Sequence, residues 1–193
     1  MTRAGRIVGL TGSVGMGKTT TAEMFAAAGL PVWDADAEVG RLYAPGGAGV
    51  PVVEARFPQA VRDGAVDRAA LRAALLSDAG ALAAFEGEIH AHVAKARREW
   101  IDARAGDVIL DVPLLFEAGI DAGCDLVVVC SAPEALQRER VLAREGMTED
   151  RLAVILSRQM PDAEKRARAD FVIDTSTMER AREGVRRVLE ALR

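Results

Sequence analysis

Short apolar runs, each bounded by turn residues, recur along the chain and are separated by stretches with helical spacing. Continuous runs of this kind, without polar alternation, are typical of strands buried on both faces of a parallel sheet. The helical stretches between them supply the crossovers that parallel pairing requires. The pattern therefore predicts an α/β fold with strands at 7–11, 31–33, 108–112, 126–130 and 171–174.

The spacing between the second and third predicted strands is much longer than a crossover needs, at about seventy residues. The stretch 43–53 is rich in Gly and Pro and predicts a loop. Residues 67–105 are rich in Ala and Leu and predict helices with a break near Ser77-Asp78. We interpret this region as a helical insertion that provides a place for a second substrate.

Two further helices are predicted next to the sheet. The segment 20–28 contains good helix formers and ends at Gly29. At the other end of the chain, residues 178–192 place their valines and leucines at helical spacing, which predicts a helix that covers the sheet.

Composition and charge narrow the classes of partner. The 193 residues predict a single domain with a buried core. The formal net charge of −4 argues against a general nucleic-acid binder, so a polyanionic substrate would need local clusters of arginine. We find neither a signal-peptide pattern nor an apolar run of membrane-spanning length, and therefore expect a cytoplasmic protein without a membrane partner.

Cys124 and Cys130 do not form a metal or redox motif, and Cys130 is predicted to be a buried thiol.

A glycine-rich motif follows the first predicted strand and opens the first predicted helix. It matches the phosphate-binding pattern G-x-x-x-x-G-K-[ST] in the strand–loop–helix context that this pattern requires. Glycines let the backbone amides approach phosphate oxygens, and the helix N-terminus adds positive charge. The alternative is a Gly-rich turn that binds nothing, but Lys18 favours a nucleotide triphosphate site because the chain has only three lysines. The predicted nucleotide-binding residues, which the resemblance described below assigns to ATP, are Gly12, Ser13, Val14, Gly15, Met16, Gly17, Lys18, Thr19 and Thr20.

Three aspartates follow predicted strands, where ligands bind in open α/β sheets. Asp34 and Asp36 come after the second strand; one of them could cap a helix while the other, which we expect to be Asp36, accepts a proton from an attacking hydroxyl or aligns it. Asp111 ends an apolar strand in the manner of a Walker B carboxylate. Thr19 and Asp111 are therefore the candidate ligands for Mg²⁺.

An arginine-rich segment follows the fourth predicted strand. Arg144, Arg151 and Arg158 are spaced by seven and would share a face on a continuous helix. Such charge runs are usually solvated helical faces. We favour a functional role because a kinase needs mobile cations that close over the transferring phosphoryl group.

Taken together, the motifs resemble the dephospho-coenzyme A kinase family from about Ile7 to the C-terminal helix. The resemblance rests on separated stretches in a fixed order: Val8–Gly12, Asp34–Asp36, Asp67-Arg68 with Leu71, Ile89-His90, Asp111–Glu117, Gln137 with Arg140 and Arg144, and Gln159 with Glu164-Lys165 and Ala169-Asp170. The chain departs from the family pattern in three places: within the P-loop at Ser13, Val14 and Met16, at Ala91 where the family has proline, and at Thr175 where it has asparagine. The first departure keeps the required glycines, the second affects a local turn, and the third affects contacts to the adenine of ATP.

The resemblance implies a P-loop kinase with a five-stranded parallel core, a helical substrate-binding insertion at about 59–105 and a lid at about 144–168. It implies transfer of the γ-phosphoryl of ATP to the ribose 3′-hydroxyl of dephospho-CoA, with Mg²⁺ as cofactor. The implied catalytic residues are Lys18, Asp36 and Arg144. The implied substrate-binding residues are Asp34, Asp36, His90, Leu114 and Glu117. We expect a monomer by default.

Two other classes of protein share a nucleotide-binding loop of this kind. A different small-molecule P-loop kinase, acting on a nucleoside monophosphate or a metabolite, would share the P-loop, but the stretches 111–117 and 159–170 favour the CoA precursor. A regulatory GTPase would read guanine through an Asn-Lys-x-Asp element, and this chain contains no asparagine.

Overall fold

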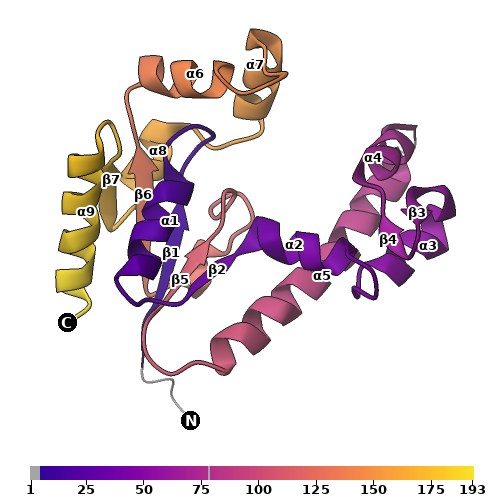
Figure 1. Cartoon of the computed structure of the whole chain (residues 1–193), viewed down its shortest axis with the longest axis horizontal. Helices are drawn as coiled ribbons and strands as arrows, with labels where there is room; N and C mark the ends of the chain where they lie inside the picture. Colours follow the sequence, from indigo (N-terminus) through magenta and orange to yellow (C-terminus); the bar gives the residue numbers. More distant parts are fainter. Residues whose placement is uncertain (1–4, 78) are drawn as a thin grey trace. The chain divides into compact units, whose positions relative to one another are not determined.

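The computed structural model describes residues 5–77 and 79–193, which divide into two compact units (Figure 1). One unit comprises Met1–Trp33 and Arg104–Arg193, of which residues 5 onward are described. The other comprises Asp34–Ala103. Each unit has its own hydrophobic core.

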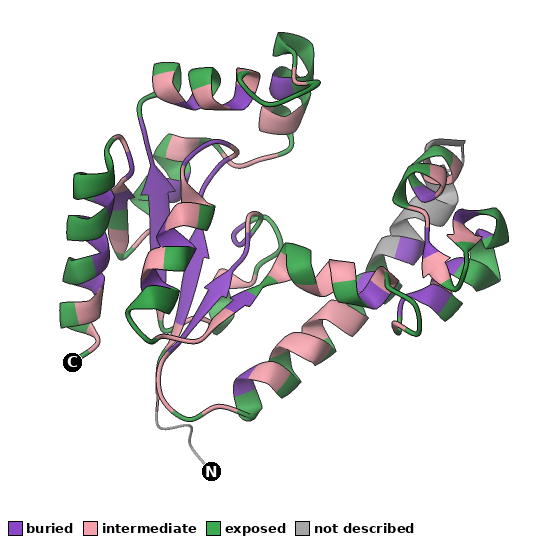
Figure 2. Cartoon of the chain, in the orientation of Figure 1, coloured by how far each residue is buried: buried purple, intermediate pink, exposed green. Residues whose placement is uncertain are grey.

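A five-stranded sheet forms the centre of the first unit, and the predicted α/β class is confirmed. Parallel pairings join β1 to β5 and β6, and β6 to β7. In order across the sheet, the strands are β2 (Val32–Asp34), β5 (Val108–Asp111), β1 (Ile7–Thr11), β6 (Leu126–Ser131) and β7 (Phe171–Asp174). All five lie within one or two residues of the predicted runs. The central strands are buried, as a doubly covered parallel sheet requires (Figure 2).

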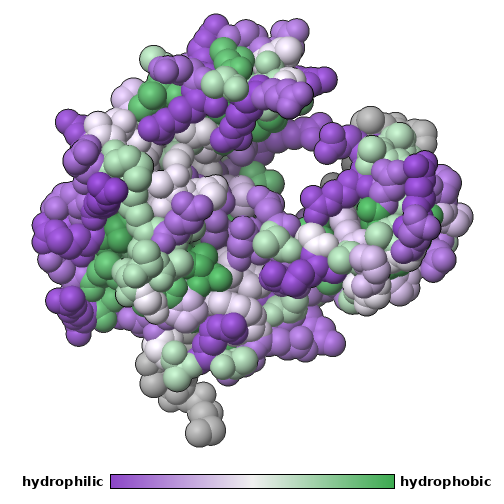
Figure 3. Space-filling view, in the orientation of Figure 1, coloured by the Kyte–Doolittle hydropathy of each residue, from purple (hydrophilic) through white to green (hydrophobic). Residues whose placement is uncertain are grey.

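Helices α1 (Lys18–Ala27) and α9 (Met178–Ala191) contact each other and share a core with β1, β6 and β7. Phe25 of α1 and Val188 of α9 are fully buried in this core. The opposite side of α9 is rich in Arg and Glu and forms a hydrophilic surface (Figure 3). Gly184 lets α9 approach the sheet, since a Cβ there would lie 2.8 Å from the Ile173 side chain.

Three consecutive helices connect β6 to β7: α6 (Glu134–Leu142), α7 (Glu149–Ser157) and α8 (Asp162–Ala167). Arg144 lies between α6 and α7, Arg151 lies within α7, and Arg158 follows it. The three arginines therefore do not lie on one continuous helix, the condition under which they would share a face. Thr148 explains the interruption, because its side chain caps the N-terminus of α7 by accepting from the Arg151 N–H.

The second unit is mostly helical. In chain order it contains α2 (Ala35–Tyr43), α3 (Val50–Arg56), the 3₁₀ turn η1 (Pro58–Ala60), the two-residue strands β3 (Val61–Arg62) and β4 (Ala65–Val66), α4 (Arg68–Ser77) and α5 (Ala79–Asp102). The predicted helix break is confirmed at the end of α4, and Asp78 lies outside the described residues. None of the helices among the described residues combines the length and apolar character needed to cross a membrane.

The predicted loop over 43–53 is wrong for its last part, because α3 begins at Val50. Pro51 stands in the first turn of α3, where the missing N–H costs no helical hydrogen bond. Val50 and Val53 are buried against Phe57 and Phe85, whose rings meet edge to face. This packing stabilises a helix that the local composition disfavours.

Candidate active site

The glycine-rich loop joins β1 to α1, as the motif predicted. The last glycine, Gly17, caps α1 in the left-handed region at φ 77°, and Gly15 has φ 78°. Such angles are readily adopted only by glycine. A Cβ on Gly15 would also lie 2.5 Å from a methyl group of Val141 on α6. Both glycines are therefore required by the conformation of the loop and by the close packing around it.

Side chains from distant segments hold the backbone of this loop. The Gln137 amide nitrogen donates to the Val14 carbonyl at 2.7 Å, and the Val14 N–H donates to the Gln159 amide oxygen at 3.1 Å. The Thr175 hydroxyl donates to the Met16 carbonyl at 2.8 Å. Gln137 and Gln159 were identified only through the resemblance, without a role, and Thr175 only as a departure at the adenine. The signal that sequence reasoning missed is a small polar residue directly after the last strand.

Lys18 and Asp111 form an ion pair beside the loop. The Lys18 ammonium lies 2.5 Å from a carboxylate oxygen of Asp111, and Asp111 is 3 % exposed. Strand pairing produces this proximity, because Leu10 of β1 is in register with Asp111 of β5. The structure thus brings together two of the predicted site residues, the P-loop lysine and the Walker B carboxylate. The Lys18 ammonium belongs to the first residue of α1, directly after the glycine-rich loop.

Asp34, the last residue of β2, and Asp36 have different environments. Asp34 caps α2, since its side chain accepts from the Ala37 N–H at 3.0 Å. Asp36 lies exposed in the first turn of the same helix. The prediction that one of them is a helix cap is confirmed for Asp34, and Asp36 retains an accessible carboxylate.

The segment after β5 is tied to α8 through a buried lysine. The Lys165 ammonium is fully buried and lies 2.9 Å from a carboxylate oxygen of Glu117 and 3.3 Å from the Pro113 carbonyl. The same Glu117 oxygen accepts from the Met160 N–H at 2.7 Å. Burial alone would raise the pKa of Glu117, but the hydrogen bonds from Lys165 and from the Met160 N–H outweigh it and lower the pKa. Glu117 is thus already engaged in an ion pair.

The remaining predicted residues lie on the surface. Leu114 is 42 % exposed after β5, Arg144 is exposed between α6 and α7, and His90 is exposed on α5. Exposure leaves each of them accessible to a substrate.

The fit to Mg²⁺ was tested on the donor set. Mg²⁺ prefers hard oxygen ligands and is usually held by one or two carboxylates together with substrate phosphates. Thr19, in the first turn of α1, is exposed and offers a hydroxyl, and Asp111 offers a carboxylate that pairs with Lys18, the residue before Thr19. Across residues 5–77 and 79–193, no cluster of three His, Cys, Asp or Glu side chains could hold a metal without a substrate. The residues therefore fit a magnesium ion that arrives with a nucleotide.

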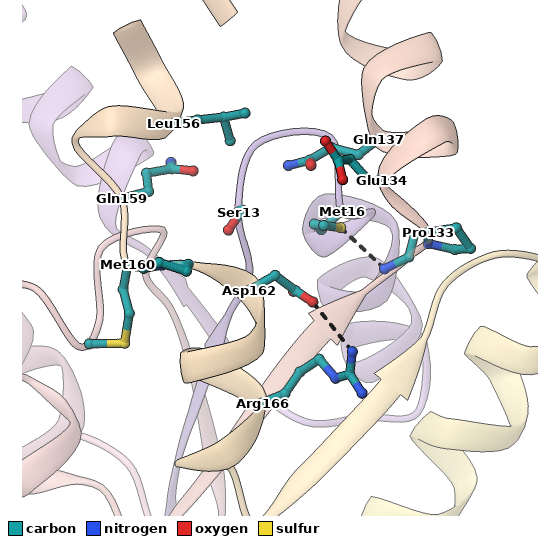
Figure 4. Close-up of a pocket in the computed structure, with 12 residues that line it drawn as sticks. Ser13, Met16, Pro133, Glu134, Gln137, Leu156, Gln159, Met160, Asp162 and Arg166 are labelled. Atoms are coloured by element: carbon teal, nitrogen blue, oxygen red, sulfur yellow. Dashed lines mark hydrogen bonds and ion pairs between the residues drawn. The ribbon is translucent and has the colours of Figure 1, made fainter. Parts of the chain in front are cut away.

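A cavity of about 480 Å³ adjoins the loop (Figure 4). Ser13 and Met16 border it on the side of the loop, and Gln137 and Gln159 border it from α6 and from the segment before α8. Polar side chains from the region between α6 and α8 therefore line the same cavity as the P-loop.

The family model described as dephospho-CoA kinase matches residues 6–180. The chain belongs to the dephospho-CoA kinase family. The dephospho-CoA kinases of Jannaschia sp. and Cereibacter sphaeroides are 53 % and 52 % identical to it over 187 residues, with 95–96 % of each chain covered.

Solved structures share the fold of this chain. A Thermus thermophilus protein is 32 % identical, with a TM-score of 0.87 and 98 % of both chains covered. A dephospho-CoA kinase from Campylobacter jejuni, at 19 % identity and a TM-score of 0.65 over 98 % of both chains, supports the fold. A shikimate kinase from Acinetobacter baumannii, at 18 % identity and a TM-score of 0.54, shares the fold over 98 % of this chain and 93 % of its own.

Proposed function

We propose that this chain transfers the γ-phosphoryl group of ATP to the ribose 3′-hydroxyl of dephospho-CoA and releases CoA and ADP. The observation that carries the proposal is a complete P-loop, with its lysine paired to the carboxylate at the end of β5, in a chain that matches the family over residues 6–180.

On this proposal, ATP is held by the loop from Gly12 to Thr20. Its amides and the N-terminus of α1 attract the phosphates, and Lys18 supplies the mobile positive charge at the transferring group. Thr19 would hold Mg²⁺, with Asp111 as a second ligand or a partner through water. The ion would neutralise charge on the phosphate oxygens as the phosphoryl group transfers.

The acceptor side rests on the residues outside the P-loop. Asp36 would orient the 3′-hydroxyl and receive its proton, since its carboxylate is exposed while Asp34 is occupied as a cap. Arg144 would offset the negative charge that develops on the transferring group. The substrate contacts proposed from the resemblance are Asp34, Asp36, His90, Leu114 and Glu117. The insertion at about 59–105 would bind the CoA-like substrate, and a lid at about 144–168 would close, in a cytoplasmic monomer.

A coupled assay of ADP release tests the proposal. Purified protein with ATP and Mg²⁺ is offered dephospho-CoA, AMP, CMP or adenosine, and the Lys18→Ala variant reports the background. We expect turnover with dephospho-CoA to exceed turnover with the other acceptors by orders of magnitude. A preference for AMP or CMP would instead identify a nucleoside monophosphate kinase, and turnover with none of them would remove the enzymatic assignment.

A further inference from the structure

Two carbonyl groups of the P-loop are held from outside the loop. The Val14 carbonyl accepts from the Gln137 amide at 2.7 Å, and the Met16 carbonyl accepts from the Thr175 hydroxyl at 2.8 Å. Gln137 and Thr175 are each only 5 % exposed. Both hydrogen bonds therefore lie in a protected environment, where they are not readily replaced by water.

The planarity of the peptide bond gives these contacts a consequence for the opposite side of the loop. In a trans peptide, the C=O of one residue and the N–H of the next point in opposite directions. When Gln137 fixes the Val14 carbonyl, the N–H of Gly15 must point away from Gln137. When Thr175 fixes the Met16 carbonyl, the N–H of Gly17 must likewise point away from Thr175. Within residues 5–77 and 79–193, neither glycine N–H donates a hydrogen bond to the protein, so both can donate to a bound anion.

The two anchoring residues are themselves rigidly placed. The Thr175 N–H donates to the Ser131 carbonyl at the end of β6 at 2.8 Å, which ties Thr175 to the sheet. The Thr175 hydroxyl lies 3.1 Å from the same carbonyl, and its one proton is donated to the nearer Met16 carbonyl at 2.8 Å. A Cβ on Gly17 would lie 3.0 Å from the Cβ of Thr175, and a Cβ on Gly15 would lie 3.0 Å from the Gln137 carbonyl. Thr175 and α6 therefore pack directly against the outer side of the loop.

We propose that Gln137 and Thr175 are positioning residues that orient the Gly15 and Gly17 amides toward the phosphates of the nucleotide. The inference deepens the proposed function and rests on it only for the identity of the anion as a polyphosphate. Preorganised amides bind an anion without paying the cost of turning two peptide groups. Thr175, where the chain departs from the family pattern, thus contacts the P-loop through its hydroxyl.

Calorimetric binding of ADP and of inorganic tripolyphosphate to the full chain tests this inference. Thr175→Val removes the hydroxyl and keeps the branched shape. We expect it to weaken both ligands by about three- to tenfold, the range that one neutral hydrogen bond spans. Thr175→Ser keeps the hydroxyl and should restore binding to within about twofold of wild type. In turnover, the KM for ATP should rise while kcat changes less, because the amides contact phosphate in both ground and transition states.

Thr11→Val is the matched control. Thr11 is also fully buried, and its hydroxyl donates to the Pro113 carbonyl at 3.0 Å, outside the loop. Its removal should lower the melting temperature comparably and leave affinity for both ligands unchanged. Gln137→Met is the second variant, which removes the amide at nearly constant length and decides the question if Thr175→Val does not fold. It should weaken both ligands by a similar factor.

Several outcomes would overturn the inference. Wild-type affinity in a folded Thr175→Val, or in Gln137→Met if Thr175→Val does not fold, would show that the anchors serve stability alone. If the affinity for ADP fell while the affinity for tripolyphosphate did not, the substituted residue would act on the nucleoside and not on the phosphates. Failure of Thr175→Ser to restore binding would show that the hydroxyl is not the active group. These measurements contain no acceptor, so they stay distinguishable from a failure of the dephospho-CoA assay.

Discussion

Replacing Glu117 with Gln removes the only carboxylate in contact with the buried ammonium of Lys165 among the described residues. Among the described residues, the same ammonium also donates to the Pro113 carbonyl at 3.3 Å. The variant therefore leaves a fully buried positive charge facing an amide and a carbonyl. We expect Glu117→Gln to destabilise the folded chain strongly.

The magnitude follows from the burial of each partner. Breaking a buried ion pair from one side costs about 3–5 kcal/mol, and the remaining amide oxygen of Gln places the expected loss near the lower limit, at about 3 kcal/mol. Lys165→Met should cost less, about 1–3 kcal/mol. The Lys165→Met variant buries no charge at this position. The Glu117 side chain is 20 % exposed and still accepts a hydrogen bond from the Met160 N–H. The double variant should be no less stable than Glu117→Gln alone, because it no longer contains an uncompensated charge.

The pH dependence has a definite sign. The pKa of Glu117 is lowered in the folded chain by the hydrogen bonds from Lys165 and Met160, which outweigh the opposing effect of burial. A lowered carboxyl pKa contributes stability above the unfolded value of about 4.3, and this stability is lost as pH falls through the folded pKa. Below about pH 4.3, the free energy of unfolding of Glu117→Gln should therefore fall less with decreasing pH than that of the wild type.

Urea unfolding followed by circular dichroism at pH 7, and repeated in steps down to about pH 3, measures these differences. A Glu117→Gln variant within about 0.5 kcal/mol of wild type would refute the reasoning. So would a Lys165→Met variant that is the less stable of the two. If stability were unchanged but the KM for dephospho-CoA rose, Glu117 would act at the substrate, as the family resemblance implies.

Three further predictions concern catalysis. Lys18→Ala should lower kcat by about 10²–10³ because a preorganised positive charge is lost, whereas Lys95→Ala, on the exposed side of α5, should leave it unchanged. Asp36→Asn should retain ADP affinity by calorimetry and lose turnover; loss of ADP binding would make Asp36 a metal or structural residue. Arg144→Ala should lower kcat in the ADP-release assay while ADP affinity holds, with Arg187→Ala on the exposed side of α9 as the control for surface charge, and an unchanged kcat would contradict a lid role.

The sheet and the phosphate loop could be predicted from sequence because their signals are local. Each strand is an uninterrupted apolar run, and the P-loop has fixed glycine and lysine positions. Asp111 was predicted at the end of its strand, but its ion pair with Lys18 was not predicted and is a finding of the structure. The β3–β4 hairpin had a usable signal that was missed: Asp63-Gly64 stands between its strands, with φ 50° and 74°.

Other features could not be predicted because they depend on residues distant in sequence. Lysine is rarely buried, and only the approach of Glu117 from another segment makes the burial of Lys165 tolerable. Val50 and Val53 form a helix in a Gly- and Pro-rich region because Phe57 and Phe85 pack against them. Thr175 stands directly after β7, but the carbonyl that its hydroxyl reaches belongs to the P-loop, which is distant in sequence.

The contacts of α8 limit how the proposed lid can move. Lys165 joins α8 to Glu117, Asp162 accepts from the Ser131 hydroxyl at 2.8 Å, and Arg168 pairs with Asp121 at 2.7 Å. Just before α8, Gln159 bonds to the P-loop itself. The C-terminal part of the segment 144–168 is thus anchored to the same unit as the sheet, whereas α7 and the arginines around it are largely exposed. A closure that brings Arg144 to the phosphates therefore has to take place before Gln159, with α8 remaining in position as its fixed end.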